Sequence, residues 1–132
     1  MRIDTQLLDN LSAKAKTSPR LRMNYDLRTT PNDHSQRMLN AMEPGTILPI
    51  HRHMESTEVV VCLRGRLREI FYGDTTHEIT DVIELSACGP CFGLSIPVGQ
   101  WHTIEVLEGG TVILETKDGA YEPIKEENIL NL

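Results

Sequence analysis

From Gln36 onward the chain consists of short apolar or alternating runs separated by turns, and this pattern constrains the fold more than any other feature. Pairs such as Pro44-Gly45 and Gly109-Gly110 mark the turns, which recur every eight to twelve residues. Short strands at this spacing are typical of antiparallel sandwiches and barrels, and no stretch resembles a strand–helix–strand unit. We therefore predict an all-β structure with eight strands: Arg37–Met42, Thr46–Ile50, Val59–Leu63, Leu67–Tyr72, Val82–Leu85, Phe92–Ile96, His102–Leu107 and Thr111–Thr116.

The N-terminal segment has a different character, because no glycine occurs before Gly45. Apolar side chains from Leu7 to Ala15 recur at helical spacing, so they share one face of a helix. Asp4 suits the N-cap of that helix, and Ser18-Pro19 suits its end. The sequence predicts one amphipathic α-helix of about three turns.

The remaining segments define the domain organisation. Residues 19–35 are polar and contain two prolines, so we expect an extension with at most one short strand. The tail, 124–132, follows a loop and is expected to form a short turn or helix. We expect the helix and extension, residues 1–35, to pack on a barrel formed by residues 36–132, giving one structural domain overall.

The composition is that of an ordinary globular protein, with 39% hydrophobic and 24% charged residues. The longest apolar run, Val59–Leu63, is far shorter than the ~20 residues that cross a bilayer. The charged N-terminus is not followed by the apolar stretch of a secretory signal. Three cysteines are too few for a disulfide scaffold. We therefore expect a cytoplasmic protein without a membrane partner.

The distribution of charge limits the class of partner. A net charge of −6 disfavours nucleic acid, because the phosphate backbone binds basic surfaces. Residues 1–68 contain 11 Arg and Lys against 7 Asp and Glu, whereas residues 69–132 contain 2 against 12. Either these halves complement each other within the fold or across a dimer, or some of the nine arginines face an anionic or oxygen-rich ligand.

Three of the five histidines have a spacing that suggests a common site. His51 and His53 are two residues apart on a predicted strand, so their imidazoles point to the same face. Glu58 begins the next strand, and His102 follows a tight turn much later in the chain. Three imidazoles and one carboxylate that converge inside a barrel would bind a divalent first-row metal, with positions left open for water or substrate.

The same residues resemble the two sequence motifs of the cupin superfamily. The first motif corresponds to Gly45, His51, His53, Glu58 and Gly65, with the family's spacing throughout. The second corresponds to Pro97, Gly99 and His102, although Cys91 stands where the motif usually opens with glycine and Val106 where it usually closes with asparagine. The resemblance implies a double-stranded β-helix (jelly-roll) barrel with His51, His53, Glu58 and His102 as metal ligands. It also implies a homodimer, since cupins are often dimeric.

Further stretches are similar to the WbuC-type cupin metalloproteins. They are Ser18–Asn24, Gln36–Ala41, Glu43–Thr46, His51–His53, Leu63–Arg66, Pro97–Thr103 and Gly119–Pro123. Members of this group are often encoded among surface-polysaccharide (O-antigen) biosynthesis genes. The resemblance leaves the reaction open, and we expect the partner of the metal site to be a small-molecule ligand or substrate.

Several candidate residues allow two interpretations. Glu55 is an alternative to Glu58 as the carboxylate ligand, although the motif spacing favours Glu58. His34 and His77 lie in polar stretches and are expected to be solvated. Cys88-Gly89-Pro90-Cys91 matches the thioredoxin active-site motif, but a β-type run follows it where thioredoxin chemistry needs a helix N-terminus. Incidental loop cysteines are therefore the favoured interpretation.

Arginine and asparagine side chains near the first motif are candidates for ligand binding. Arg37 and Asn40 precede the motif in a segment expected to border the barrel opening, so we interpret both as substrate-binding residues. Arg64, Arg66 and Arg68 alternate along the chain, and we expect them on the exposed polar face of a sheet.

Two functions are consistent with these features. The favoured one is a metal-dependent enzyme, such as an isomerase, epimerase or oxygenase, that acts on a small oxygenated substrate such as a sugar derivative. The alternative is a non-catalytic protein that binds or senses a small molecule through its metal. The ligand set accepts Fe, Mn, Zn, Ni or Co, and the sequence does not identify catalytic residues beyond it.

Overall fold

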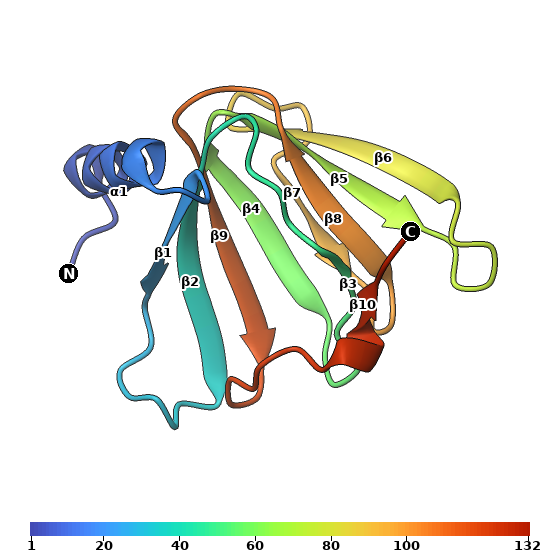
Figure 1. Ribbon diagram of the computed structural model, residues 1–132. Helices are drawn as coiled ribbons and strands as arrows, with labels where there is room; N and C mark the ends of the chain where they lie inside the picture. The colour runs from blue at the N-terminus through green and yellow to red at the C-terminus, as the bar shows by residue number, and fades with distance from the viewer.

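The computed structural model describes all residues, 1–132, and contains one α-helix and ten strands in two five-stranded antiparallel sheets (Figure 1). The first sheet has the order β1-β2-β9-β4-β7 and the second the order β10-β3-β8-β5-β6. The sheets lie face to face, and the chain passes repeatedly from one to the other, as in a jelly roll. The elements are α1 (Thr5–Thr17), β1 (Arg22–Asp26), β2 (Ser35–Met42), β3 (Ile50–His51), β4 (Glu58–Arg64), β5 (Arg66–Tyr72), β6 (Ile79–Ser86), β7 (Gly93–Ile96), β8 (Trp101–Val106), β9 (Thr111–Asp118), the 3-10 turn η1 (Glu126–Asn128) and β10 (Ile129–Leu130). The predicted fold class is confirmed.

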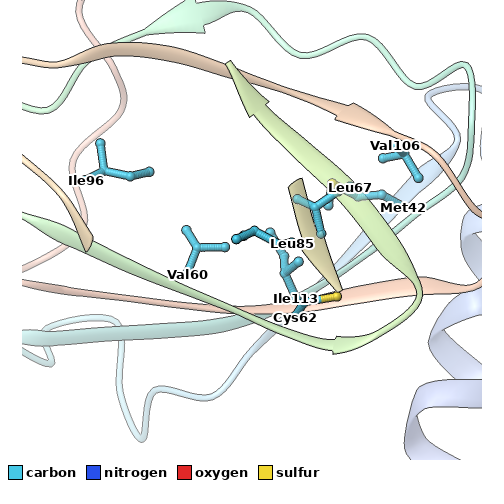
Figure 2. Close-up of a cluster of buried hydrophobic side chains, with 8 residues drawn as sticks. All are labelled: Met42, Val60, Cys62, Leu67, Leu85, Ile96, Val106 and Ile113. Atoms are coloured by element: carbon cyan, nitrogen blue, oxygen red, sulfur yellow. The ribbon is translucent and has the colours of Figure 1, made fainter. Parts of the chain in front are cut away.

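The core lies between the two sheets and follows the alternation of side chains along each strand. On β4, Val60 and Cys62 point inward, and on β5 and β8 Leu67 and Val106 face each other across the strand pair. Figure 2 shows these side chains converging from both sheets. The complete cluster is Met42, Val60, Cys62, Leu67, Leu85, Ile96, Val106 and Ile113, all buried. Cys62 thus packs as a small apolar residue in the barrel interior.

Helix α1 packs on the outer face of the first sheet. Leu11 and Ala15 are buried against Leu39, Ala41 and Val112, which project from the side of β2 and β9 opposite the core. The helix begins where predicted, because the Asp4 side chain accepts a hydrogen bond from the backbone N–H of Leu7 at 3.0 Å. It ends before Ser18, and residues 22–26 add the edge strand β1.

Of the three alternating arginines, Arg64 differs from its expected place on an exposed polar face. Its guanidinium contacts Asp9 at 2.6 Å and Ser12 at 3.1 Å, so it ties α1 to the sheet. Arg66 and Arg68 lie at the surface and pair with Glu84 and Glu105.

The predicted strand Thr46–Ile50 is wrong in most of its length, since only Ile50 and His51 pair with a neighbouring strand. The chain turns at Glu43, where the Thr46 N–H donates to the Glu43 carbonyl, and Pro49 has no N–H to contribute to a ladder. The C-terminal tail contains η1 and also β10, which was not predicted and pairs with β3.

Candidate metal centre

Four donor side chains meet between the sheets. His51 is the last residue of β3 and pairs across the ladder with His102 on β8. His53 follows two residues after His51, beyond the end of the strand, and Glu58 is the first residue of β4. One ligand atom from each of the four lies within 4.8 Å of every other. The structure therefore brings together all four residues that the motif spacing singled out, and it places Glu58 in the cluster, not the exposed Glu55.

Hydrogen bonds to backbone carbonyls orient two of the imidazoles. Nδ1 of His51 lies 3.0 Å from the Pro49 carbonyl oxygen, and Nδ1 of His102 lies 2.8 Å from that of Gln100. These contacts leave both Nε2 atoms available to a ligand, and carbonyl partners of this kind fix the tautomer of metal-binding histidines. Nε2 of His53 and of His102 lie 3.0 Å and 3.8 Å from Oε2 of Glu58.

Burial favours the neutral form of two of the imidazoles, which is the form that binds a metal. It lowers the pKa of His51 to about 4, with a contribution from the nearby His102, and it also lowers the pKa of His102. Burial alone would raise the pKa of Glu58, but the neighbouring side chains of His53, His102 and Lys117 lower it below the usual range. Neutral imidazoles beside an ionised carboxylate are the forms that coordinate metals.

One buried atom in the cluster lacks a partner that a metal ion would supply. Oε2 of Glu58 is buried, and its 3.0 Å contact with Nε2 of His53 does not have the geometry of a hydrogen bond, although buried carboxylate oxygens are normally satisfied. Three nitrogen donors and one oxygen donor at this mutual distance suit a divalent first-row transition metal, and they leave positions open on an ion that prefers five or six ligands. The residues present therefore fit such an ion.

The four donors border a cavity of about 310 Å³ between the sheets. Ile104, Leu48 and Pro49 give it an apolar wall, and Tyr121, Glu122 and Ile124 border it from the segment that follows β9. Its other lining residues are polar: Arg20, Arg22, Asn24, Asn40, Glu69, Glu115 and Lys117, together with Met38. A cavity of this size is at the lower end of the roughly 300–1,000 Å³ typical of ligand pockets.

Two carboxyl groups that the sequence motifs do not predict also line this cavity. Glu69 is fully buried, and neither of its carboxyl oxygens has a hydrogen-bond partner. Burial raises its pKa well above the usual range, and burial together with the charge of Glu58 raises the pKa of Glu115 to about 8. The alternation of side chains along the strands could have identified both residues. Glu69 lies on the same face of β5 as the buried Leu67, and Glu115 lies on the same face of β9 as the buried Ile113.

The two predicted substrate-binding residues lie in different places. Asn40 borders the cavity with its buried Oδ1 unpartnered. Arg37 lies on the opposite side of β2 and does not line this cavity: its guanidinium pairs with Asp33 at 3.0 Å and donates to the Ser35 carbonyl. A role for Arg37 in ligand binding stays a prediction.

The other candidate residues lie outside the cluster. His34 is exposed as expected, whereas His77 is half-buried and its ring lies edge-on to Trp101 at 6.3 Å. Cys88 is exposed and Cys91 half-buried, both are free thiols, and no helix follows them. With 13 residues, α1 is too short to span a bilayer, and the structure contains no other α-helix.

Comparison with solved structures identifies the fold. CapF from Staphylococcus aureus, a capsular polysaccharide assembling protein, matches with a TM-score of 0.69 and 24% identity over 88% of this chain and 33% of CapF. KdgF from Halomonas sp. matches with a TM-score of 0.61 and 14% identity over 80% of this chain and 85% of KdgF. The Mn(II)-containing oxalate decarboxylase from Bacillus subtilis matches with a TM-score of 0.59 and 20% identity over 84% of this chain and 28% of the enzyme.

These similarities show the cupin jelly-roll fold, and the chain spans about a third of the length of CapF. No curated protein sequence matches the chain. A family model described as a domain of unknown function (DUF6016) matches residues 3–85, which is 83 of the 132 residues. The chain therefore has the cupin fold and belongs to the DUF6016 family.

Proposed function

We propose that the chain binds one divalent transition metal ion through His51, His53, Glu58 and His102, and that it is an enzyme acting on a small oxygenated molecule such as a sugar derivative. The observation that carries the proposal is the position of four mutually close donor atoms at the wall of a ligand-sized cavity. Catalytic metal sites keep positions open toward such a cavity, whereas structural sites are closed.

The residues of the cavity have distinct parts in this proposal. A bound divalent ion supplies Lewis acidity toward a hydroxyl or carbonyl oxygen. The Pro49 and Gln100 carbonyls hold His51 and His102 in one orientation. Glu69 and Glu115 place two further carboxyl groups in the same cavity, where they can hold or accept a proton beside a bound substrate. These parts support isomerisation or epimerisation best, and an oxygenase reaction is the alternative.

We also propose a link to surface-polysaccharide biosynthesis and a relation to the WbuC-type cupins. The similarity in fold to CapF, a capsular polysaccharide assembling protein, supports this context. The similarity to the Mn(II)-containing oxalate decarboxylase supports manganese as one of the candidate metals beside iron, zinc, nickel and cobalt.

Metal content measured by mass spectrometry tests the proposal. The protein is purified without chelator or nickel affinity resin, beside a His51→Ala/His53→Ala variant and a His34→Ala/His77→Ala control that removes two histidines outside the cluster. We expect close to one equivalent of a transition metal in the wild type and the control, and a loss of at least tenfold in the cluster variant. No metal in the wild type, even after reconstitution, would overturn the ligand assignment.

Turnover separates the enzyme from a binding protein. The metal-loaded protein is incubated with free sugars, nucleotide sugars and keto acids, with and without oxygen, and products are followed by NMR. Conversion of a substrate that the cluster variant does not convert supports the enzyme. Saturable binding without conversion would favour the non-catalytic, metal-dependent binding protein instead.

A further inference from the structure

Two arginines from the N-terminal extension line the same cavity as the candidate metal centre. Arg22 opens β1 and pairs with Met42, whose side chain belongs to the interior core. Residues paired across antiparallel strands project on the same face of a sheet, so Arg22 projects into the interior. Arg20, two residues earlier, also borders the cavity.

Neither guanidinium has an acidic partner, a property that these two arginines share only with Arg2 at the N-terminus, which does not line the cavity. Six of the nine arginines form an ion pair with Asp or Glu: Arg28, Arg37, Arg52, Arg64, Arg66 and Arg68. Arg22 instead donates to the Ile47 carbonyl at 2.8 Å, which holds one arm of the guanidinium in place. Both side chains line this one cavity, and burial together with the positive charge of Arg20 lowers the pKa of Arg22.

The cavity also contains acceptor atoms that the protein leaves unsatisfied. Oδ1 of Asn40 and both carboxyl oxygens of Glu69 are buried without a hydrogen-bond partner. Such atoms are costly unless a ligand or water satisfies them, and ligand hydroxyl groups are suitable donors. The cavity thus combines two cations that have no acidic partner with oxygen atoms that can accept hydrogen bonds from hydroxyl groups.

We propose that Arg20 and Arg22 form an oxyanion subsite, and that the ligand of the metal centre is a small hydroxylated anion: its carboxylate or phosphate group binds these arginines while its hydroxyl groups bind Asn40 and Glu69. Planar guanidinium groups suit carboxylate and phosphate oxygens, and an anion removes the repulsion between the two arginines. The cavity volume of about 310 Å³ restricts the ligand to a small molecule. This inference rests on the proposed function, because it names the ligand class of the same site.

Isothermal titration with matched probes tests the inference. The probes are gluconate (carboxylate and hydroxyls), glucose 6-phosphate (phosphate and hydroxyls), glucose (hydroxyls alone), and acetate and inorganic phosphate (anions alone). Each is titrated into Mn²⁺-loaded and metal-free protein. We expect gluconate or glucose 6-phosphate to bind at least about tenfold more tightly than glucose and than the corresponding simple anion. The stronger of the two identifies the acidic group.

Single substitutions assign the binding to these residues. Arg20→Gln is expected to weaken the preferred anionic probe about tenfold and to leave glucose within about twofold, whereas Arg66→Gln, a surface arginine, changes neither. Arg22→Gln is expected to act in the same way, and thermal unfolding checks its fold. Arg20→Gln keeps the test valid if Arg22→Gln is unstable, because Arg20 is exposed. Glu69→Gln is expected to weaken the hydroxylated probes and to leave inorganic phosphate unchanged.

Several outcomes would overturn the subsite. They are equal affinity for glucose and the anionic probes, unchanged affinity of the Arg20→Gln variant, and no binding of either hydroxylated anion at millimolar concentration. Metal bound at the four donors together with any of these results contradicts the subsite and leaves the proposed function intact. If the protein binds no metal but still selects anionic probes through Arg20, the proposed function is contradicted and the subsite is retained.

Discussion

The barrel interior has an apolar half and a polar half, although the same strands build both. The apolar half is the cluster around Leu67, Val106 and Ile113, and the polar half is the cavity with the four metal donors, Glu69 and Glu115. On β5, Leu67 and Glu69 are two residues apart and both fully buried. One strand therefore passes from a side chain that stabilises the fold to one that burial penalises.

The apolar half mainly stabilises the fold, whereas the polar half supplies the groups for binding and chemistry. The apolar half removes hydrocarbon from water, which is the main favourable term in folding. The polar half keeps buried groups without partners, including Oε2 of Glu58 and both carboxyl oxygens of Glu69. Such groups persist in native proteins where a ligand, ion or proton completes them. Substitutions in the two halves should therefore change stability with opposite sign.

The largest effect is expected in the apolar half. Leu67→Ala removes a fully buried side chain that faces Val106 across the ladder and should lower the free energy of unfolding by about 2–5 kcal/mol. Urea denaturation of the metal-free protein measures this. Val82→Ala, at a side chain 48% exposed on the neighbouring strand β6, is the control and should stay within about 0.5 kcal/mol. A Leu67→Ala change as small as the control would contradict the assignment of stability to this half.

Glu69→Met should act in the opposite direction. Replacing the unpartnered carboxyl with an apolar side chain of similar length should raise the free energy of unfolding of the metal-free protein by about 1–3 kcal/mol. Leu67→Met, two residues earlier, is the matched control and should lower it by less than about 1.5 kcal/mol. The same denaturation experiment measures both. If Glu69→Met destabilises the protein, the carboxyl has a structural partner and the contrast between the halves fails.

Much of the fold could be predicted from the sequence, because the patterns that indicate its strands and helix are local. Turn residues and alternating apolar positions define most strands, and Asp4 and Ser18 define the ends of the helix. The irregular stretch from Thr46 to Pro49 was not predicted, because its apolar composition resembles a strand while its proline removes a ladder hydrogen bond. Strand β10 is only two residues long, and its pairing with β3 is non-local.

The candidate site was predicted only where a motif preserves its spacing. His51, His53, Glu58 and His102 come from three strands and a loop, and no local pattern places them together. Glu69 was accessible in principle, since a carboxyl at a core-facing position of β5 breaks the apolar alternation. Arg20 and Arg22 were not, because their cavity is shaped by the packing of an extension on the sheet.

A smaller effect is expected in the dependence of stability on pH. The pKa of Glu115 is about 8 in the folded protein, above its ordinary value of 4.5, so between these values the folded state binds more protons than the unfolded state. This group therefore destabilises the fold progressively as pH rises through that window, by at most about 1.4 kcal/mol per pH unit. His51, whose pKa is lowered to about 4, acts in the opposite sense between pH 4 and 6.5.

Glu115→Gln isolates the first contribution. In metal-free protein between pH 5 and 8, the stability of this variant should fall less steeply with rising pH than that of the wild type, as measured by urea denaturation at several pH values. Glu105→Gln, at an exposed carboxyl on β8, should leave the wild-type slope unchanged. If the free energy of unfolding depends on pH in the same way for the wild type and Glu115→Gln, Glu115 is ionised and solvated. It would then not belong to the buried polar half.

The smallest effect is expected for the two cysteines beside the apolar half. Cys91 packs against the core cluster and Cys88 is exposed, and neither borders the cavity of the metal centre. A Cys88→Ser/Cys91→Ser variant should lose less than about 1 kcal/mol of stability and should keep the wild-type metal content and the wild-type response to oxidants. If oxidants change the metal binding or turnover of the wild type but not that of this variant, the thioredoxin-like motif has a redox function. The apolar half would then carry chemistry as well as stability, and the division between the two halves would have to be abandoned.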